Sequence, residues 1–489
     1  MLRIPVRLLL AGCFALLFLN GIKNPVTLQA AFDRMNADSA LKHGAWGVCV
    51  LTADSGKMVA AYNAEQSLIP ASTLKILTTG AAIGLLGENY RYVTTIEHDG
   101  IFDTLNGIIR GSVYLRGSGD PTFDSKYFRK GDTIGAIEKL PLRLKQLGVK
   151  RIEGDIIGDA SCFSDNPVPD GWTWSDIGQY YGAGTSGLAY RDNAVTLYFN
   201  STQGDSAVLE KVIPRPDGVN YRSFVTTGGK KDNAFVYGAP FGNTYYIYGT
   251  IPPGRKDYEV DAAHPEPALQ CAADYLAGLK KAGIVVTGKA TTIRRMEMAN
   301  ENIKLKRKSL SAILSPTLAE IVRETNLHSD NVYAEQLLRT LGKVKGAAGS
   351  TEEGVRVVKN YWQSLGIPIA GLNMTDGNGL SRSNTVTTKI QAMILQKIST
   401  MSWSAVFEQS LPIAGRSGSL ASLCKGTCAE NNLTAKSGYI NRARGYAGYV
   451  KTQSGKKLCF SIIANNYTCS ATEMKKKIEK ILVTIAELP

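Results

Sequence analysis

Alternation of apolar and polar residues near both ends of the chain predicts two β-hairpins. Residues 46–51 and 58–62 alternate on either side of a short turn. Residues 446–452 and 458–464 show the same pattern. After the second hairpin, residues 474–485 carry apolar positions at helical spacing between lysines, which predicts an amphipathic basic helix. Strands at both ends indicate that the two termini belong to one structural unit.

Helices are predicted inside this unit. From Pro70 onward the chain is apolar nearly all round until Gly87, which is typical of a buried helix. Residues 315–325 begin with Ser and Pro and predict a second helix, and residues 330–341 predict a third. The helical character of the first unit therefore resumes near Leu310.

The pattern of residues changes between these helices. From about Tyr90, short strands alternate with glycine turns, as in 111–117 and 151–159. Residues 172–254 are rich in Gly, Tyr, Asn and Thr and contain strand-like pieces at 194–199 and 243–248. This pattern predicts a small β module nested inside a second unit.

We therefore expect a multidomain α/β protein with a discontinuous first domain. The expected parts are a leader at 1–30, an α/β domain from 31–89 and 306–489, an inserted α/β domain from 90–171 and 255–305, and a nested small β domain at 172–254.

Composition and charge exclude several classes of protein. The chain has 489 residues, of which 44% are hydrophobic and 20% charged, so full disorder is excluded. The net charge of +14 suits anionic surfaces such as acidic lipid or cell-wall polymer. The Lys and Arg residues are scattered, with no zinc-finger spacing or basic-zipper heptads, so no nucleic-acid partner is expected.

The N-terminus has the pattern of a secretory signal. Arg3 and Arg7 precede an apolar run at 8–19, and small residues favour cleavage near Ala30. This predicts an exported protein of the periplasm or cell envelope. An uncleaved anchor and a lipoprotein box ending at Cys13 are the alternatives. No later segment is long and apolar enough to span a membrane.

Cysteine and histidine usage predicts neither a disulfide scaffold nor a metal site. Eight cysteines are spread thinly over the chain, although Cys424 with Cys428, or Cys459 with Cys469, could close short loops. The four histidines lie in no HExxH or GxSxG context. A histidine-based triad or a His-rich metal site therefore has few candidates.

A serine and a lysine start the buried helix. Ser72 and Lys75 lie one turn apart on the same face. Burial lowers the pKa of a lysine, so the amine can take the proton from the hydroxyl of a nucleophilic serine. Ser39, Ser422 and Ser454 also have Lys three residues later, but only Ser72 opens a long apolar helix after Pro-Ala. A purely structural role is the alternative for this pair.

Two further short motifs follow along the chain. Ser329 and Asn331 lie at a junction between helices, where Ser329 could instead be a helix N-cap. Lys436-Ser437-Gly438 occurs once and precedes the predicted strand at 446–452. Its alternative interpretation is a solvated lysine in a turn.

Taken in order, Ser-x-x-Lys, Ser-x-Asn and Lys-Ser-Gly resemble the active-site motifs of the penicillin-recognising serine D,D-peptidases. The separation of Ser72 from Ser329 is much longer than in β-lactamases. It resembles the low-molecular-mass class C D-alanyl-D-alanine carboxypeptidase/endopeptidases, whose peptidase domain carries a large insertion. Further matches lie at 117–122, 172–183, 376–382 and 411–415. The resemblance covers nearly all of the chain after the leader.

The resemblance implies a β-lactamase/transpeptidase-like peptidase domain, an antiparallel sheet flanked by helices, with an insertion that forms one or two smaller β-rich domains. It implies peptidoglycan stem peptides as substrates and β-lactam antibiotics as covalent inhibitors. No metal and no organic cofactor is required. Peripheral association with a membrane is left open.

The resemblance also implies roles for the motif residues. Ser72 would attack the carbonyl of the D-Ala-D-Ala bond, Lys75 would take its proton, and an acyl-enzyme would form and be hydrolysed. Ser329 would relay a proton to the leaving amine. Asn331 would hold the amide of the substrate, and Lys436 would supply positive potential.

The third motif departs from the usual family pattern. Ser437 would bind the terminal carboxylate of the substrate. The oxyanion hole would be formed by the backbone N–H groups of Ser72 and of Tyr439, the residue after Gly438. The family usually has Thr at the middle of this motif and a small hydroxyl residue after it. The bulky Tyr439 is expected to affect substrate preference and deacylation.

Three more residues match the stem-peptide pocket of the family. Asp176 and Tyr181 lie in the insertion and Arg382 in the stretch 376–382. Asp176 would pair with the free amine of the stem-peptide side chain. For Arg382 an ion pair that anchors the loop is the alternative.

Three other functions are weighed against a D,D-peptidase. A catalytically weak β-lactam-binding relative is disfavoured because all three motifs are intact. A β-lactamase or esterase of the same fold is disfavoured by the long insertion and by the pocket residues. A basic cell-surface adhesin would need the motifs to coincide by chance.

Overall fold

The computed structural model describes residues 27–129 and 135–489. Most of the expected leader, including Cys13, lies outside these residues. Its last residues begin helix α1, Leu28–Asn36, where the Thr27 side chain accepts a hydrogen bond from the N–H of Ala30 and Leu28 is buried. The cleavage position expected near Ala30 therefore falls within the first turn of a packed helix.

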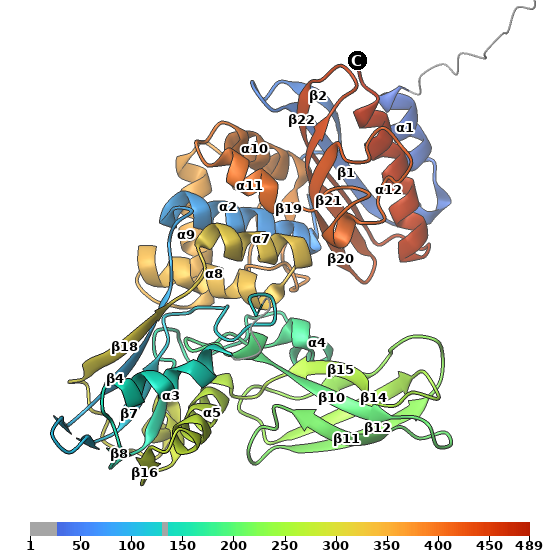
Figure 1. The fold of residues 1–489 in the computed structure, drawn as a ribbon. Coiled ribbons are helices and arrows are strands. Elements are labelled where there is room, and N and C mark those ends of the chain that lie inside the picture. Colours follow the sequence, from blue (N-terminus) through green and yellow to red (C-terminus); the bar gives the residue numbers. More distant parts are fainter. Residues whose placement is uncertain (1–26, 130–134) are drawn as a thin grey trace, which may run out of the picture.

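Strands from both ends of the chain form one antiparallel sheet, as the two predicted hairpins indicated. The sheet has five strands in the order β2-β1-β22-β21-β20. Val48 of β1 is paired with Ile462 of β22, so the two chain ends meet at the centre of the sheet (Figure 1). The strands are β1 (Ala45–Thr52), β2 (Met58–Tyr62), β20 (Leu433–Ile440), β21 (Ala443–Lys451) and β22 (Lys457–Asn465).

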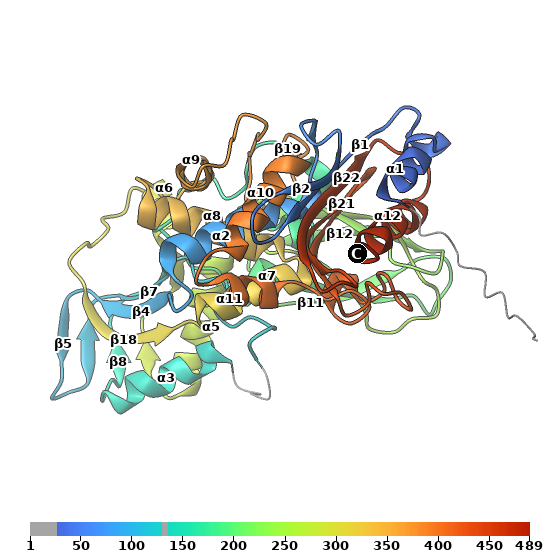
Figure 2. The same cartoon turned by 90° about the horizontal axis from the view of Figure 1, so that it is seen from above.

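Helices cover both faces of this sheet (Figure 2). α1 and α12 (Ala471–Ala486) lie on one face, and a second group of helices lies on the opposite face. Local signals start several of them, such as the reciprocal side-chain caps of Thr317 with Glu320 and of Ser470 with Glu473. The second group comprises α2 (Lys75–Leu86), α7 (Leu318–His328), α8 (Asn331–Lys345), α9 (Thr351–Ser364), α10 (Thr388–Ser399) and α11 (Ser404–Ser410). A two-stranded sheet of β3 (Ser67–Leu68) and β19 (Val386–Thr387) lies beside them.

The insertion contains two further sheets, in the orders β17-β9-β7-β4-β18 and β16-β8-β6-β5. α3 (Ala136–Gln146) and α5 (Pro267–Lys281) share its core, and α6 (Ile293–Met298) follows β17. Its strands are β4 (Val93–His98), β5 (Ile101–Asp103), β6 (Ile108–Arg110), β7 (Val113–Arg116), β8 (Arg151–Ile152), β9 (Ile156–Asp159), β16 (Val285–Val286), β17 (Ala290–Thr292) and β18 (Lys308–Leu314).

Strand β18 marks the return of the chain from the insertion. It pairs antiparallel with β4, so residues 308–314 belong to the sheet of the insertion. The sequence pattern assigned residues from 306 onward to the first domain. The difference arises because strand pairing across more than two hundred residues leaves no trace in a local pattern.

A nested β unit lies inside the insertion and consists of two three-stranded sheets. The sheets are β11-β10-β15 and β12-β14-β13, and they pack face to face over a core that includes Leu197, Val236 and Ile247. Strand β15 continues this unit past the expected boundary at residue 254. Its strands are β10 (Ala194–Asn200), β11 (Val208–Ile213), β12 (Asn220–Thr227), β13 (Phe235–Tyr237), β14 (Thr244–Ile251) and β15 (Tyr258–Ala263).

These observations confirm the expected fold class, a multidomain α/β protein with an antiparallel sheet flanked by helices and a large insertion that carries smaller sheets. Within the described residues, no helix is both long and apolar enough to cross a bilayer. All seven cysteines of that part of the chain are free thiols, so neither Cys424 with Cys428 nor Cys459 with Cys469 closes a loop.

Candidate active site

Ser72 lies in a tight turn that continues directly into helix α2. A 3₁₀ turn, Ala71–Leu74, precedes Lys75, the first residue of α2. Ala71 adopts the left-handed region with φ of 48°, which is unfavourable for a residue with a Cβ. Ser72 is partly exposed, whereas Lys75 is fully buried. The turn thus presents a hydroxyl at the surface directly above a buried amine.

Three oxygen atoms surround the amine of Lys75. Its Nζ lies 3.0 Å from Ser72 Oγ, 2.6 Å from Asn331 Oδ1 and 2.8 Å from the carbonyl oxygen of Asn378. A neutral amine has two hydrogens, and the amide and carbonyl oxygens can only accept. When the amine is neutral, these two oxygens take both hydrogens and the lone pair is left facing the hydroxyl of Ser72. The geometry is that of a base next to a nucleophile.

Burial also sets the protonation state of this amine. Desolvation lowers the pKa of Lys75 to about 7, although the negative charges of Asp376, Asp330 and Glu335 act in the opposite direction. A substantial fraction of Lys75 is therefore neutral near neutral pH. This is the range in which an amine is most effective as a general base.

The second motif lies between helices α7 and α8. Ser329 ends α7 in the left-handed conformation with φ of 60°, and Asp330 is the N-cap of α8, accepting a hydrogen bond from the N–H of Tyr333 at 2.9 Å. The alternative interpretation of Ser329 as an N-cap is therefore wrong. Asn331 begins α8, and its Nδ2 donates to the backbone oxygen of Tyr181 at 2.8 Å.

The third motif lies within β20, an edge strand, and not in a turn before a strand. Lys436 is fully buried, and its Nζ donates to Ser329 Oγ at 2.8 Å and to the carbonyl oxygen of Ser437 at 2.9 Å. Burial, with a smaller effect of the Lys75 charge, holds the pKa of Lys436 well below its usual range. The structure therefore brings all three motifs together around one site.

Gly438 lets β20 approach the turn that carries Ser72. A Cβ at this position would lie 2.4 Å from the carbonyl oxygen of Pro70 and 3.1 Å from the backbone nitrogen of Ser72. Because side chains alternate along a strand, Ser437 and Tyr439 point to the opposite face from Gly438. Ser437 Oγ lies 2.7 Å from Ser419 Oγ, which the sequence analysis did not identify.

Tyr439 is held on that opposite face by its cross-strand neighbour. Arg444 is paired with Tyr439 across β20 and β21, and its guanidinium carbon lies 4.9 Å from the centroid of the ring. The ring remains 51% exposed. The bulky side chain therefore lies on the same face of β20 as Ser437 and packs against Arg444.

Hydrogen bonds to buried carboxylates fix the loop that carries Asn378, whose carbonyl contacts Lys75. Glu335 on α8 accepts hydrogen bonds from the N–H of Gly377 at 2.7 Å and from Thr351 Oγ1 at 3.0 Å. Asp376 in the same loop accepts from Trp172 Nε1 at 3.0 Å. Together they fix the loop whose Asn378 carbonyl contacts Lys75.

Sequence reasoning did not identify Glu335 or the carbonyl of Asn378. A signal was present for the carboxylate, because Glu335 lies one helical turn after Asn331 in a stretch that is buried on both sides. Burial raises the pKa of Glu335 to about 7, and the charge of Asp376 adds to this effect. No sequence pattern reports where a backbone carbonyl points.

We expect Glu335→Ala to destabilise the protein by about 2–4 kcal/mol in the free energy of unfolding, because it leaves a buried N–H and a buried hydroxyl without their acceptor. Glu335→Gln keeps one acceptor oxygen and is expected to cost less. Urea unfolding of both variants measures the difference. Equal stability of Glu335→Ala and the unmodified protein would contradict this role.

Hydrogen bonds connect two residues of the predicted stem-peptide pocket, Asp176 and Tyr181, to Asn331. Asp176 lies in α4 (Trp174–Ile177), where its carboxylate accepts from Thr173 Oγ1 at 2.7 Å and from the hydroxyl of Tyr181 at 3.3 Å. The backbone of Tyr181 in turn accepts from Asn331, as described above. Asp176 and Tyr181 are therefore connected to the residues around Lys75.

Arg382 follows the loop that carries Asn378. Its NH1 donates to the backbone oxygen of Asn441, just beyond β20, at 3.2 Å, and the side chain is exposed. Among the described residues, no ion pair anchors Arg382 and no hydrogen bond joins it to Asp176. The alternative of a loop-anchoring ion pair is thus not what the structure shows.

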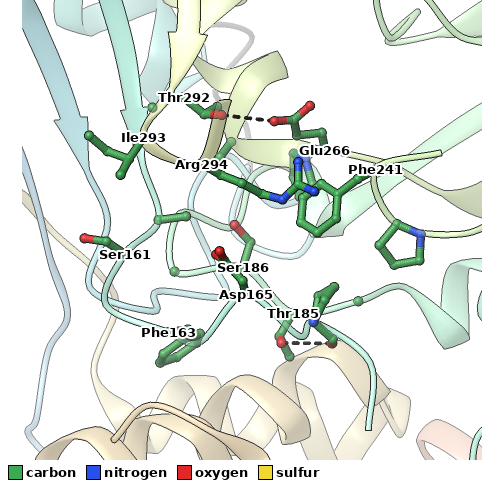
Figure 3. Close-up of a pocket in the computed structure, with 18 of the residues that line it drawn as sticks. Ser161, Phe163, Asp165, Thr185, Ser186, Phe241, Glu266, Thr292, Ile293 and Arg294 are labelled. Atoms are coloured by element: carbon green, nitrogen blue, oxygen red, sulfur yellow. Dashed lines mark hydrogen bonds between the residues drawn. The ribbon is translucent and has the colours of Figure 1, made fainter. Parts of the chain in front are cut away.

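A separate cavity of about 70 Å³ lies in the insertion (Figure 3). Glu266 accepts a hydrogen bond from Thr292 Oγ1 at 3.0 Å in its wall, and the guanidinium of Arg294 stacks 3.6 Å from the ring centroid of Phe241. None of the residues of the three motifs lines it. The chemistry of the motifs is therefore separate from this cavity.

Comparison with known proteins gives a consistent result. The sequence profile described as the D-Ala-D-Ala carboxypeptidase 3 (S13) family matches residues 28–488. A D-alanyl-D-alanine carboxypeptidase of Actinomadura sp. (strain R39) is 26% identical over 458 residues, covering 90% of this chain and 81% of the relative. The D-alanyl-D-alanine carboxypeptidase DacB of Haemophilus influenzae is 23% identical over 438 residues, covering 87% and 86%.

A solved structure shares the fold. The crystal structure of penicillin binding protein 4 (dacB) from Haemophilus influenzae superimposes with a TM-score of 0.76 at 22% sequence identity. The match covers 91% of this chain and 96% of that chain. The similarity therefore extends over the insertion as well as the sheet that is built from both termini.

Proposed function

The chain belongs to the D-Ala-D-Ala carboxypeptidase 3 (S13) family, and we propose that it is an exported serine D,D-peptidase that cleaves peptidoglycan stem peptides through an acyl-enzyme on Ser72. The observation that carries this proposal is the amine of Lys75, which lies 3.0 Å from the Ser72 hydroxyl while two other oxygens can take its hydrogens. The basic leader pattern at residues 1–30 supports export to the periplasm or cell envelope.

In the first step, Ser72 Oγ attacks the carbonyl carbon between the two D-Ala residues while its proton passes to Lys75 Nζ. The backbone N–H groups of Ser72 and Tyr439 stabilise the oxyanion. As the C–N bond breaks, the proton held by Lys75 passes through Ser329 to the leaving amine of D-Ala. Water then attacks the ester and gives a proton to Lys75, which passes it to Ser72 Oγ as the C–O bond of the ester breaks. The acid product leaves, and the Ser72 hydroxyl is restored.

Lys436 and Ser437 recognise the carboxylate of the departing D-Ala. Burial lowers the pKa of Lys436. A substrate carboxylate beside the amine favours its charged form and acts in the opposite direction. A cross-linked stem peptide offers the same D-Ala carbonyl, so the same acyl-enzyme serves endopeptidase cleavage.

β-Lactams follow the same first step. Attack of Ser72 on the lactam carbonyl opens the ring and leaves a covalent adduct on the serine. One of the similar structures, penicillin binding protein 4 from Haemophilus influenzae, has been solved in complex with a β-lactam, which supports this proposal. A weak β-lactam-binding relative or a β-lactamase would share the acylation and differ in the fate of the ester.

The experiment that tests the proposal follows a labelled penicillin and D-Ala release in parallel. The purified chain is incubated with the drug and digested, and the modified peptide is identified by mass. A stable adduct on Ser72 together with release of D-Ala from a pentapeptide supports the D,D-peptidase. Rapid loss of the label with drug hydrolysis points to a β-lactamase, and absence of any adduct contradicts the proposal.

We expect Asp176→Ala to weaken turnover of stem peptides with a free side-chain amine by about tenfold and to spare their acetylated counterparts, because one charged hydrogen bond contributes about 1.5–3 kcal/mol. Asp170→Ala, an exposed carboxylate nearby, is the matched control. The kcat/KM values for both peptides give the comparison. Equal losses on the two peptides would show that Asp176 does not bind the amine.

A further inference from the structure

One sheet of the nested β unit exposes aromatic side chains on its outward face. Phe224 remains 55% exposed, and Trp174, which lies at the edge of the sheet, remains 54% exposed. We call this set of six residues the aromatic face, and it comprises Trp174, Phe224, Phe235, Tyr237, Tyr246 and Tyr248.

The rings of the aromatic face form a continuous row across the strands. Phe224 and Phe235 are both paired with Tyr248, on β12 and β13 respectively. The rings of Phe224 and Tyr248 are stacked, with centroids 5.0 Å apart and an angle of 8° between their planes. Tyr237 lies 5.9 Å from Tyr248 and 6.2 Å from Trp174.

The rings of the aromatic face do not belong to the core of the β unit. The inward residues of the same strands, such as Val225, Val236 and Ile247, already fill the space between the two sheets. In this mixed sheet β12 runs parallel to β14, and β13 runs antiparallel to it. A sheet face that is exposed to solvent is normally polar. Exposed clusters of aromatic residues on a monomer mark surfaces that bind a partner.

The row leads toward the active site. Trp174 belongs to the same short helix as Asp176, whose carboxylate accepts a hydrogen bond from Tyr181, and Tyr181 is bonded to Asn331. In Figure 1, α4 lies between the nested β unit and the domain that carries Ser72. The aromatic face thus begins where the proposed stem-peptide pocket ends.

We propose that the aromatic face binds the glycan strand to which the stem peptide is attached. This inference rests on the proposed function and extends it. A sugar ring presents a flat side of C–H groups that packs on an aromatic ring, while its hydroxyl groups stay in water at the edge. A row of rings matches a row of sugars, whereas aliphatic side chains offer no such flat surface.

The geometry of the substrate favours this occupant over a second copy of the chain. An extended peptide covers about 3.5 Å per residue, so the glycan stays close to Ser72 when a short stem peptide reaches it. The row of rings also continues into the residues beside the pocket, which a surface for self-association would not require.

The test removes three rings that lie away from the pocket. The variant Phe224→Ser, Phe235→Ser, Tyr248→Ser is compared with Tyr198→Ser, a control on the outward face of the opposite sheet. Both are assayed with a sugar-free pentapeptide and with the same peptide on intact glycan strands. We expect the triple variant to lose about tenfold or more in kcat/KM on the glycan-linked substrate only. The control is expected to match the unmodified protein on both substrates.

Several outcomes would overturn the inference. Equal losses on both substrates, or no loss on either, would show that the aromatic face does not act on the glycan. A dimer of the unmodified protein that the triple variant converts to a monomer, measured by light scattering, would assign the face to a second copy.

Binding of peptide-free glycan strands in a sedimentation assay separates this inference from the proposed function. A protein that fails to release D-Ala but binds these strands through the aromatic face would contradict only the proposed function. In Ser72→Ala, loss of D-Ala release together with unchanged strand binding would support both the proposed function and this inference. Strand binding that is equal in the unmodified protein and the triple variant would overturn the inference.

Discussion

Replacement of Ser72 by alanine is expected to abolish peptide turnover and covalent penicillin labelling together. The variant lacks the hydroxyl that we propose forms the ester, while the amine of Lys75 and the contacts of Asn331 remain in place. Loss of a catalytic nucleophile lowers kcat by about 10⁴-fold or more in serine hydrolases. The measurement is D-Ala release with mass mapping of the penicillin adduct.

Ser454→Ala is the matched control for this experiment. Ser454 also has a lysine three residues later, but it lies in the turn between β21 and β22, where its hydroxyl contacts Thr452. This variant should keep full turnover and full labelling. An adduct that persists on Ser72→Ala would show that another side chain is the nucleophile.

Replacement of Lys75 by methionine is expected to slow acylation by about 10²- to 10⁴-fold, the usual contribution of a general base. Methionine fills a similar volume in the buried site and cannot accept the proton from Ser72. Lys75→Arg is the informative companion, because it keeps a positive charge and hydrogen-bond donors but does not lose its proton. Acylation that survives in Lys75→Arg would show that charge, and not proton transfer, is what Lys75 supplies.

The pH dependence of acylation follows from the same amine. Burial lowers the pKa of Lys75 to about 7, and only the neutral form can take the proton. The acylation rate of the unmodified protein should therefore rise as the pH rises through about 7 and level off above it. In Lys75→Met this rise should be absent. A rate that is flat between pH 5 and 9 in the unmodified protein, a range of about two units on either side of that pKa, would contradict the assignment.

Local sequence patterns were sufficient for much of the fold. The two terminal hairpins, the buried helix after Pro70 and the β-rich character of the nested unit follow from spacing that acts over a few residues. Ser72 and Lys75 could be paired for the same reason, because a helical turn fixes their distance. The order and context of the three motifs then indicated the family.

Other parts of the site depend on contacts between distant segments. Lys436 lies in an edge strand, and not in the turn of the alternative interpretation, because β20 pairs with β21 and because Gly438 can approach the turn at Ser72. The pairing of β18 with β4 is of the same kind. Such pairings are decided by the whole fold and not by the residues of one strand.

The sequence by itself determined the fold class, the family and the residue types of the three motifs, because these depend on local periodicity and on a fixed order of short motifs. Only the tertiary structure decided how the amine of Lys75 is oriented. Its direction follows from the oxygens of Asn331 and Asn378, which arrive from segments more than two hundred residues away. The direction of a carbonyl is a property of packing, and no local pattern encodes it.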